Sequence, residues 1–146
     1  LIAVFGLPPF SHENDADRGV LCGLSMMVEM AQNNVKASMG VTTGVAFCGV
    51  IGHISNRREY TVIGDSINLA ARLMVAARAQ KTEILIDQDT KTGLREGLDL
   101  KEVSLQLKGK GLVTAYMVDI KQKPSDPIMS QRSLSAHSIN MKVPKK

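Results

Sequence analysis

The 146-residue sequence contains no tryptophan, and aromatic residues make up only 3% of it. Proteins that bind single-stranded nucleic acid stack bases on aromatic side chains, so this scarcity argues against that function. No apolar stretch approaches the ~20 residues that a membrane-spanning helix needs. The sequence shows no signal peptide and no initiator methionine, and it begins within an apolar run. We therefore expect it to be a piece of a longer protein, cut within a domain.

Cysteine is also scarce, with only Cys22 and Cys48 in the chain. Their positions lack the spacing of a metal-binding motif, so free, buried thiols in a reducing compartment are expected. A disulfide between them stays open at this point. We accordingly expect a cytoplasmic location, or the intracellular side if the parent protein is attached to a membrane.

The formal net charge of +4 is unevenly distributed along the chain. Residues 121–146 contain six basic residues and one acidic residue, so they carry +5 while residues 1–120 carry −1. The nearly neutral larger part gives no reason to expect binding to nucleic acid. The basic segment is rich in proline, serine and lysine and has little hydrophobic periodicity. It is typical of a disordered tail or linker.

Residues 1–120 show the alternation of strand and helix patterns that is typical of an α/β or α+β domain. Apolar residues at helical spacing, from Val20 to Ala31, predict a helix that ends at Asn33. A bend at Gly44 is expected to separate two strands within residues 39–52. Further strands are expected over residues 1–6, 60–63, 83–87, 103–108 and 112–119, and further helices from about residues 65 and 87.

Asn68 and Arg72 lie four residues apart near the start of an almost wholly apolar helical segment. This spacing places both side chains on one face, about one turn apart. Arginine presents a planar fork of donors suited to phosphate, and an amide can hold a hydroxyl group. A simpler interpretation stays open: Arg72 pairs with a carboxylate elsewhere, and Asp65 or Ser66 only caps the helix.

Three blocks of sequence occur in an order and at a spacing that point to one family. They read Gly40-x3-Gly44-x4-Gly49-Val50-Ile51-Gly52, then Tyr60-Thr61-Val62-Ile63-Gly64-Asp65-x2-Asn68-x-Ala70-x-Arg72, then Leu107-Lys108-Gly109-Lys110-Gly111. Together they resemble the catalytic domain of the class III nucleotidyl cyclases, over about residues 1–120. Within that family, residues 4–8, 47–53 and 59–64 look most like the second cyclase domain of the soluble adenylyl cyclases.

The resemblance implies an α+β fold for residues 1–120, the ferredoxin-like βαβ sandwich of this family, truncated here at its N-terminus. Residues 121–146 would follow as the disordered basic tail. The implied reaction converts ATP to cyclic AMP and pyrophosphate, through attack of the ribose 3′-hydroxyl on the α-phosphorus. In this family two Mg²⁺ ions (or Mn²⁺) activate the hydroxyl and neutralise phosphate charge. Two cyclase domains packed head to tail form each site.

Four residues receive roles from this resemblance. Asn68 would orient the ribose, and Arg72 would stabilise the pentacoordinate phosphorus of the transition state. Thr61, seven residues before Asn68, would read the adenine edge at a position where guanylyl cyclases typically carry cysteine. Lys108 would contact the terminal phosphates, with Lys110 as a second choice.

The family's pair of metal-binding aspartates lies upstream of the part that this chain matches. We therefore expect no metal ligand in this chain, and interpret Asp65 as a helix cap. The metal ligands are expected outside this segment or on the partner domain. The expected partners are ATP and a second cyclase domain, in the same polypeptide or in a homodimer, and not nucleic acid. The alternative hypothesis is a non-catalytic pseudo-cyclase lobe that supports dimerisation or binds a regulatory nucleotide.

Overall fold

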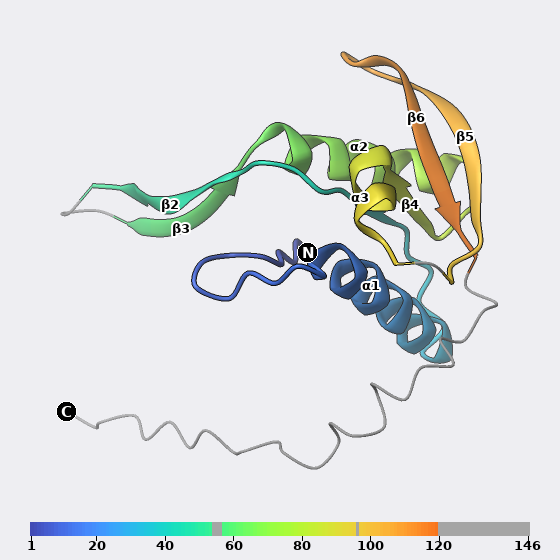
Figure 1. The fold of residues 1–146 in the computed structure, drawn as a ribbon, viewed down its shortest axis with the longest axis horizontal. Helices are drawn as coiled ribbons and strands as arrows, with labels where there is room; N and C mark the ends of the chain where they lie inside the picture. Colours follow the sequence, from blue (N-terminus) through green and yellow to red (C-terminus); the bar gives the residue numbers. More distant parts are fainter. Residues whose placement is uncertain (54–56, 96, 120–146) are drawn as a thin grey trace.

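We analysed a computed structural model of the chain, which describes residues 1–53, 57–95 and 97–119 (Figure 1). The elements follow one another as α1 (Asp15–Gln32), β1 (Met39–Val41), β2 (Phe47–Gly52), β3 (Arg58–Ile63), α2 (Asp65–Ala79), β4 (Ile84–Asp87), α3 (Gln88–Gly93), β5 (Leu100–Leu107) and β6 (Gly111–Val118). Among the described residues, no helix is both long enough and apolar enough to cross a membrane.

Four strands form the central sheet, in the order β1-β4-β6-β5. β1 is parallel to β4, with Met39 opposite Ile84, whereas β6 is antiparallel to β4 and to β5. All four residues of β4 are buried, because helices cover both faces of the sheet. Successive side chains of a strand point to opposite faces, so Ile84 and Ile86 enter one core and Leu85 enters the other.

The first core lies between the sheet and α1. Its buried members are Val20, Leu24, Met27, Ile84, Ile86, Tyr116 and Val118. The α1 members recur at helical spacing, so the apolar stripe of this helix is the face that packs on the sheet. The second core lies between the other face of the sheet and α2, and comprises Leu73, Ala77, Leu85, Leu105, Leu107 and Ala115.

Helix α2 packs closely on β1 at a glycine. A Cβ atom on Gly40 would lie 2.1 Å from the carbonyl oxygen of Ala70 and 2.8 Å from the amide nitrogen of Met74. Only a residue without a side chain allows this approach. The glycine therefore sets the position of α2, and with it the position of the Asn68/Arg72 face.

Strands β2 and β3 form a separate antiparallel hairpin, which projects away from the central sheet as an arm (Figure 1). Apolar side chains are exposed on both of its faces: Phe47, Val50, Ile51, Tyr60 and Ile63 are each about half to two-thirds exposed. An isolated two-stranded hairpin is marginally stable in water.

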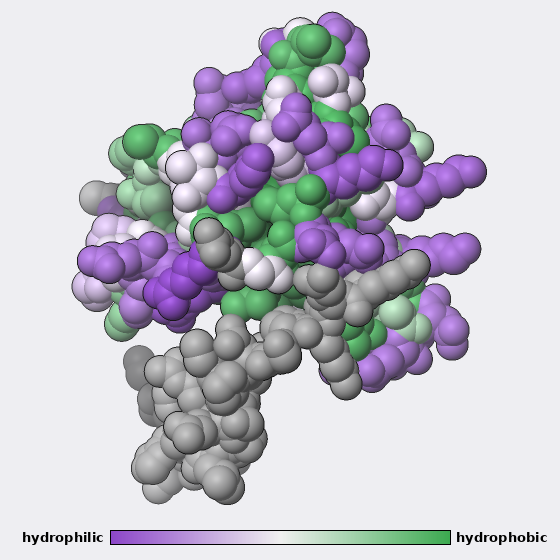
Figure 2. Space-filling model, turned by 45° about the vertical axis from the view of Figure 1, so that its right-hand side comes forward, coloured by the Kyte–Doolittle hydropathy of each residue, from purple (hydrophilic) through white to green (hydrophobic). Residues whose placement is uncertain are grey.

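Exposed apolar residues are not confined to this arm, because the face drawn in Figure 2 also shows them between hydrophilic side chains.

The elements agree with the sequence-based expectation, except in two places. The strand predicted over residues 1–6 is wrong, because this segment has no strand geometry and pairs with no described strand, while Leu1 and Ile2 stay largely exposed. A short apolar run becomes a strand only where a neighbour supplies the backbone hydrogen bonds. The predicted tail, residues 121–146, lies outside the described residues.

The second correction concerns the start of α2. The N-cap position is occupied by Gly64 and has no side-chain capping bond, so neither Asp65 nor Ser66 caps the helix. A Cβ at Gly64 would lie 2.9 Å from the carbonyl oxygen of Val45, so the segment before β2 approaches too closely there for a larger residue. Asp65 is the first residue of the helix itself, and its carboxylate is stabilised there by the positive end of the helix dipole.

Both cysteines are free, as expected, and each is half-buried rather than fully buried.

Candidate functional site

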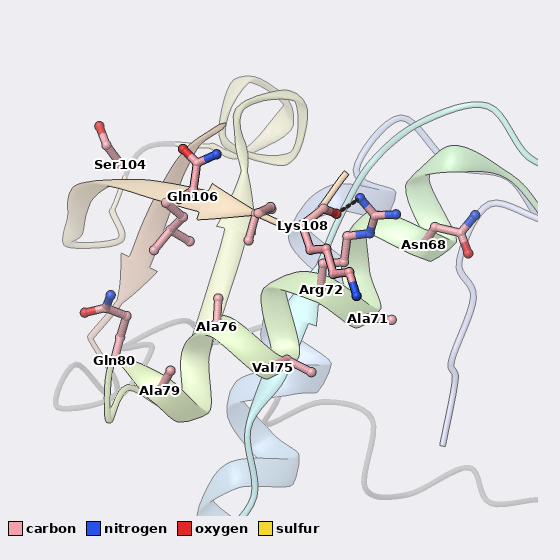
Figure 3. A pocket seen from close by; sticks show the side chains of 12 residues that line it. Asn68, Ala71, Arg72, Val75, Ala76, Ala79, Gln80, Ser104, Gln106 and Lys108 are labelled. Carbon is pink, nitrogen blue, oxygen red and sulfur yellow. Dashed lines mark hydrogen bonds between the residues drawn. The ribbon is translucent and has the colours of Figure 1, made fainter. Parts of the chain in front are cut away.

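The site is built on one face of α2. Asp65, Asn68 and Arg72 follow one another at intervals of three and four residues, so they form a single stripe along this helix. The stripe faces the end of β5 and the turn that follows it. A groove of about 730 Å³ lies between α2 and β5, and Asn68, Arg72 and Lys108 line one end of it (Figure 3). The structure therefore brings together three of the four residues predicted from sequence.

The fourth predicted residue, Thr61, lies elsewhere in the described structure. It is half-buried on β3, opposite Gly49 in the hairpin, and does not line the groove. Thr61 lies in β3, the strand just before α2, and β3 belongs to the projecting arm rather than to the central sheet. A base-reading role for Thr61 stays a prediction.

Arg72 is held by the backbone of the turn between β5 and β6. Its Nη1 atom donates a hydrogen bond to the carbonyl oxygen of Lys108, at 2.5 Å (Figure 3). Hydrogen bonds to charged donors are shorter and stronger than neutral ones. Because a guanidinium has five N–H donors, this bond fixes the group while leaving other donors for a ligand.

The turn between β5 and β6 contacts α2 at a second point. Nζ of Lys110 lies 3.6 Å from Oδ2 of Asp65, at the first residue of the helix. The Asp65 side chain is 89% exposed, so water and salt screen this pair and it contributes little to overall stability. The pair nevertheless directs Lys110 toward the helix N-terminus, while Lys108 lines the groove.

Three further polar residues of the groove were not predicted from the sequence. Ser104 and Gln106 project from β5, and Gln80 ends α2 (Figure 3). Leu105 and Leu107 pack in the core beneath α2, so alternation places the side chains of Ser104 and Gln106 on the other face of β5, at the rim of the groove. Nothing in the sequence indicates that Gln80 shares their groove, because that depends on how the helix packs.

The described residues do not offer a metal site. They contain no group of three or more histidine, cysteine, aspartate or glutamate side chains placed to hold an ion. Magnesium prefers an octahedral set of oxygen ligands. Asp65, the acidic residue of the stripe, has its carboxylate beside Lys110.

Comparison with known proteins identifies the family. The adenylate and guanylate cyclase catalytic domain matches residues 3–120, most of the chain, so the protein belongs to that family. The adenylyl cyclase CyaB from P. aeruginosa has a similar structure, with a TM-score of 0.65 and 28% identity, over 82% of this chain and 66% of that chain. The predicted family and the predicted α+β fold are thus confirmed.

The curated relatives include both kinds of cyclase. Adenylate cyclase type 10 of Homo sapiens is 37% identical over 76 residues, which are 51% of this chain and 5% of that protein. Guanylate cyclase beta of Plasmodium berghei is 36% identical over 90 residues, which are 60% of this chain and 3% of that protein. The chain therefore spans only a small fraction of these relatives, and they do not define which nucleotide it uses.

Proposed function

We propose that this chain is part of an adenylyl cyclase, and that it supplies the Asn68/Arg72 half of a site formed with a second cyclase domain. The observation that carries the proposal is that Asn68, Arg72 and Lys108 all line one end of the groove. An amide, a guanidinium and an ammonium group there match the ribose and phosphates of a nucleoside triphosphate. The similarity to adenylate cyclase type 10 supports ATP as the substrate.

In the proposed reaction, the 3′-hydroxyl oxygen of ATP forms a bond to the α-phosphorus and releases its proton to solvent. The bond from that phosphorus to the bridging oxygen breaks, and pyrophosphate leaves with that oxygen. Negative charge increases on the α-phosphate oxygens in the transition state. The N–H groups of Arg72 that are not bonded to Lys108 would donate to those oxygens. A preorganised donor aimed at developing charge is among the largest contributions that a protein makes to catalysis.

The other residues position the substrate. Asn68, one turn before Arg72, would bind the ribose and orient its 3′-hydroxyl toward the α-phosphorus. The ammonium group of Lys108 would bind the terminal phosphates and the leaving pyrophosphate. Thr61 would pair with the adenine edge from the hairpin, once the partner domain completes the site.

The site needs a second cyclase domain, either in the same polypeptide or in a homodimer. The projecting β2–β3 hairpin supports this, because its apolar side chains are exposed on both faces. A head-to-tail partner would cover them. Mg²⁺ or Mn²⁺ would then be held outside this segment or by the partner. The 146-residue chain alone is accordingly expected to form no cyclic AMP.

The decisive experiment measures cyclic AMP formation from ATP by the full-length parent protein, with Mg²⁺ or Mn²⁺. We expect Arg72→Ala to lower kcat by about a hundredfold or more, because removing one transition-state donor typically costs that much. The KM for ATP should change far less, because the interaction strengthens in the transition state. Asn68→Ala combined with Arg72→Ala should abolish activity.

Gln80→Ala is the matched control, because Gln80 lines the opposite end of the same groove. It should leave kcat within about twofold of the wild type, as a surface substitution usually does. If the Asn68/Arg72 double variant keeps its activity, the chemistry lies elsewhere. The chain would then be a supporting, pseudo-cyclase lobe.

A further inference from the structure

The turn after β5, residues Lys108–Lys110, is joined to α2 at two points. Lys108 accepts the hydrogen bond from Arg72, and Lys110 forms the ion pair with Asp65. Asp65 and Arg72 are seven residues apart, so the two links are separated by about 10 Å along the helix axis. Asn68 lies between them on the same stripe. The turn therefore spans the part of α2 that carries both proposed catalytic side chains.

A glycine lies directly against the guanidinium. Gly109 has φ +75°, and a Cβ built on it would lie 3.4 Å from Nη1 and 3.7 Å from Nη2 of Arg72. The shorter of these distances lies at the lower limit of ordinary van der Waals contact, so an alanine there would press directly on the guanidinium. Gly111 has the same φ of +75°, but nothing lies within 4 Å of the corresponding Cβ position.

We propose that this turn is a positioning element for Arg72. The Lys108 carbonyl holds the guanidinium, Gly109 leaves the space for it, and the Asp65–Lys110 pair keeps the turn over the helix. The inference rests on the proposed function of Arg72 and adds Gly109, Lys110 and Asp65 as residues that act through it. None of the three needs to touch the substrate.

The physical reason is preorganisation. A free arginine side chain samples many rotamers, and ordering it during the reaction raises the barrier. A bond to a fixed backbone carbonyl restricts those rotamers before substrate binds, while the remaining N–H donors stay available. Misplacing a catalytic group by about 1 Å can cost about a hundredfold in rate. Disturbing the turn should therefore lower kcat and leave the KM for ATP almost unchanged.

The first test compares Gly109→Ala with Gly111→Ala in the full-length parent protein. Both variants place an L-residue at the same positive φ, so both carry the same backbone strain. Only the methyl group added by Gly109→Ala would contact the guanidinium of Arg72. We expect Gly109→Ala to lower kcat at least about fivefold with KM within about twofold. Gly111→Ala should leave both parameters within about twofold. Equal effects of the two variants would overturn the proposal.

The second test does not depend on a glycine and keeps the proposal testable if Gly109→Ala fails to fold. Lys110→Met removes the ion pair and should lower kcat about two- to fivefold, the range that an exposed pair supports. Lys110→Arg preserves the pair and should retain more of kcat than Lys110→Met does. A loss that appears only in the KM for ATP would overturn the positioning role and assign Lys110 to the phosphates.

Measuring the turn variants in an Arg72→Ala background distinguishes a failure of this inference from a failure of the proposed function. Gly109→Ala and Lys110→Met should have no further effect on kcat there, because both act through Arg72. If Arg72→Ala lowers kcat as proposed but the turn variants behave like the wild type, only the positioning role is wrong. If Arg72→Ala is itself fully active, the proposed function fails and the positioning role fails with it.

Discussion

Nη1 of Arg72 and the carbonyl oxygen of Lys108 lie 2.5 Å apart, in a hydrogen bond that connects two motifs separated by 36 residues in the chain. The proposed site therefore uses Lys108 in two ways. Its backbone carbonyl accepts the bond from Arg72, and its side chain lines the groove at the same end. A side-chain substitution removes only the second function, so the two can be tested independently.

Replacing Lys108 with methionine should therefore weaken substrate binding more than turnover. The variant loses the ammonium group proposed to bind the terminal phosphates but keeps the carbonyl that accepts from Arg72. We expect the KM for ATP to rise about tenfold, as for the loss of one charged hydrogen bond, while kcat falls less. Steady-state kinetics of the parent protein provides the measurement. A fall in kcat with an unchanged KM would contradict the assignment.

Replacing Thr61 with cysteine should relax the choice of base toward GTP. The hydroxyl of Thr61 can both donate and accept, whereas a thiol is a weak donor and acceptor, so the preference for the adenine edge should diminish. The measurement is the ratio of kcat/KM for ATP and GTP in the parent protein.

Thr61→Ser is the control, because it keeps the hydroxyl and should keep the ATP preference. An ATP to GTP ratio that is the same in Thr61→Cys and in the wild type would remove the base-reading role. The position of Thr61 on the hairpin would then be purely structural.

The sequence predicted features that depend on local pattern. Helical spacing of Val20, Leu24 and Met27 predicted α1, and the interval between Asn68 and Arg72 predicted their shared face. Family resemblance then added Lys108, and the groove brings it to that same face. Each of these predictions uses residues close in sequence or a motif with fixed spacing.

The sequence could not predict what depends on contacts between distant segments. The ion pair of Asp65 with Lys110 joins residues 45 positions apart, and it depends on where the turn after β5 meets α2. The strand predicted over residues 1–6 failed for the same kind of reason, because strand formation requires a partner elsewhere in the chain. The close approach of α2 to Gly40 is likewise visible only in the packed structure.

Replacing Gly40 with alanine should destabilise the fold. Its Cβ would lie 2.1 Å from the Ala70 carbonyl oxygen and 2.9 Å from Cβ of Leu73, so α2 would have to move away from β1. Overpacking against a rigid backbone typically costs about 1–3 kcal/mol, and the expected loss is at the upper end. Urea unfolding of the chain should show a lower midpoint.

Gly19→Ala is the matched control for that prediction. Gly19 lies inside α1, and its Cβ would make ordinary contacts of 3.6 Å with Phe5 and 3.7 Å with Val41. Because alanine favours a helix over glycine by about 1 kcal/mol, the unfolding midpoint should rise. Shifts of the same sign in both variants would contradict the packing argument.

Serine substitutions on the hairpin should weaken pairing with the second cyclase domain. Phe47 and Val50 are each 62% exposed and lie on opposite faces of the β2–β3 arm, so each face can be tested alone. If a partner covers these side chains, Phe47→Ser or Val50→Ser should weaken association at least about tenfold, since a buried large apolar side chain contributes about 1.5–3 kcal/mol. The measurements are sedimentation equilibrium and the protein concentration needed for half-maximal cyclase activity. Val35→Ser, at a position 53% exposed between α1 and β1, should leave both unchanged. Unchanged association in both hairpin variants would mean that the arm does not carry the interface, and that the partner domain meets this chain through another surface.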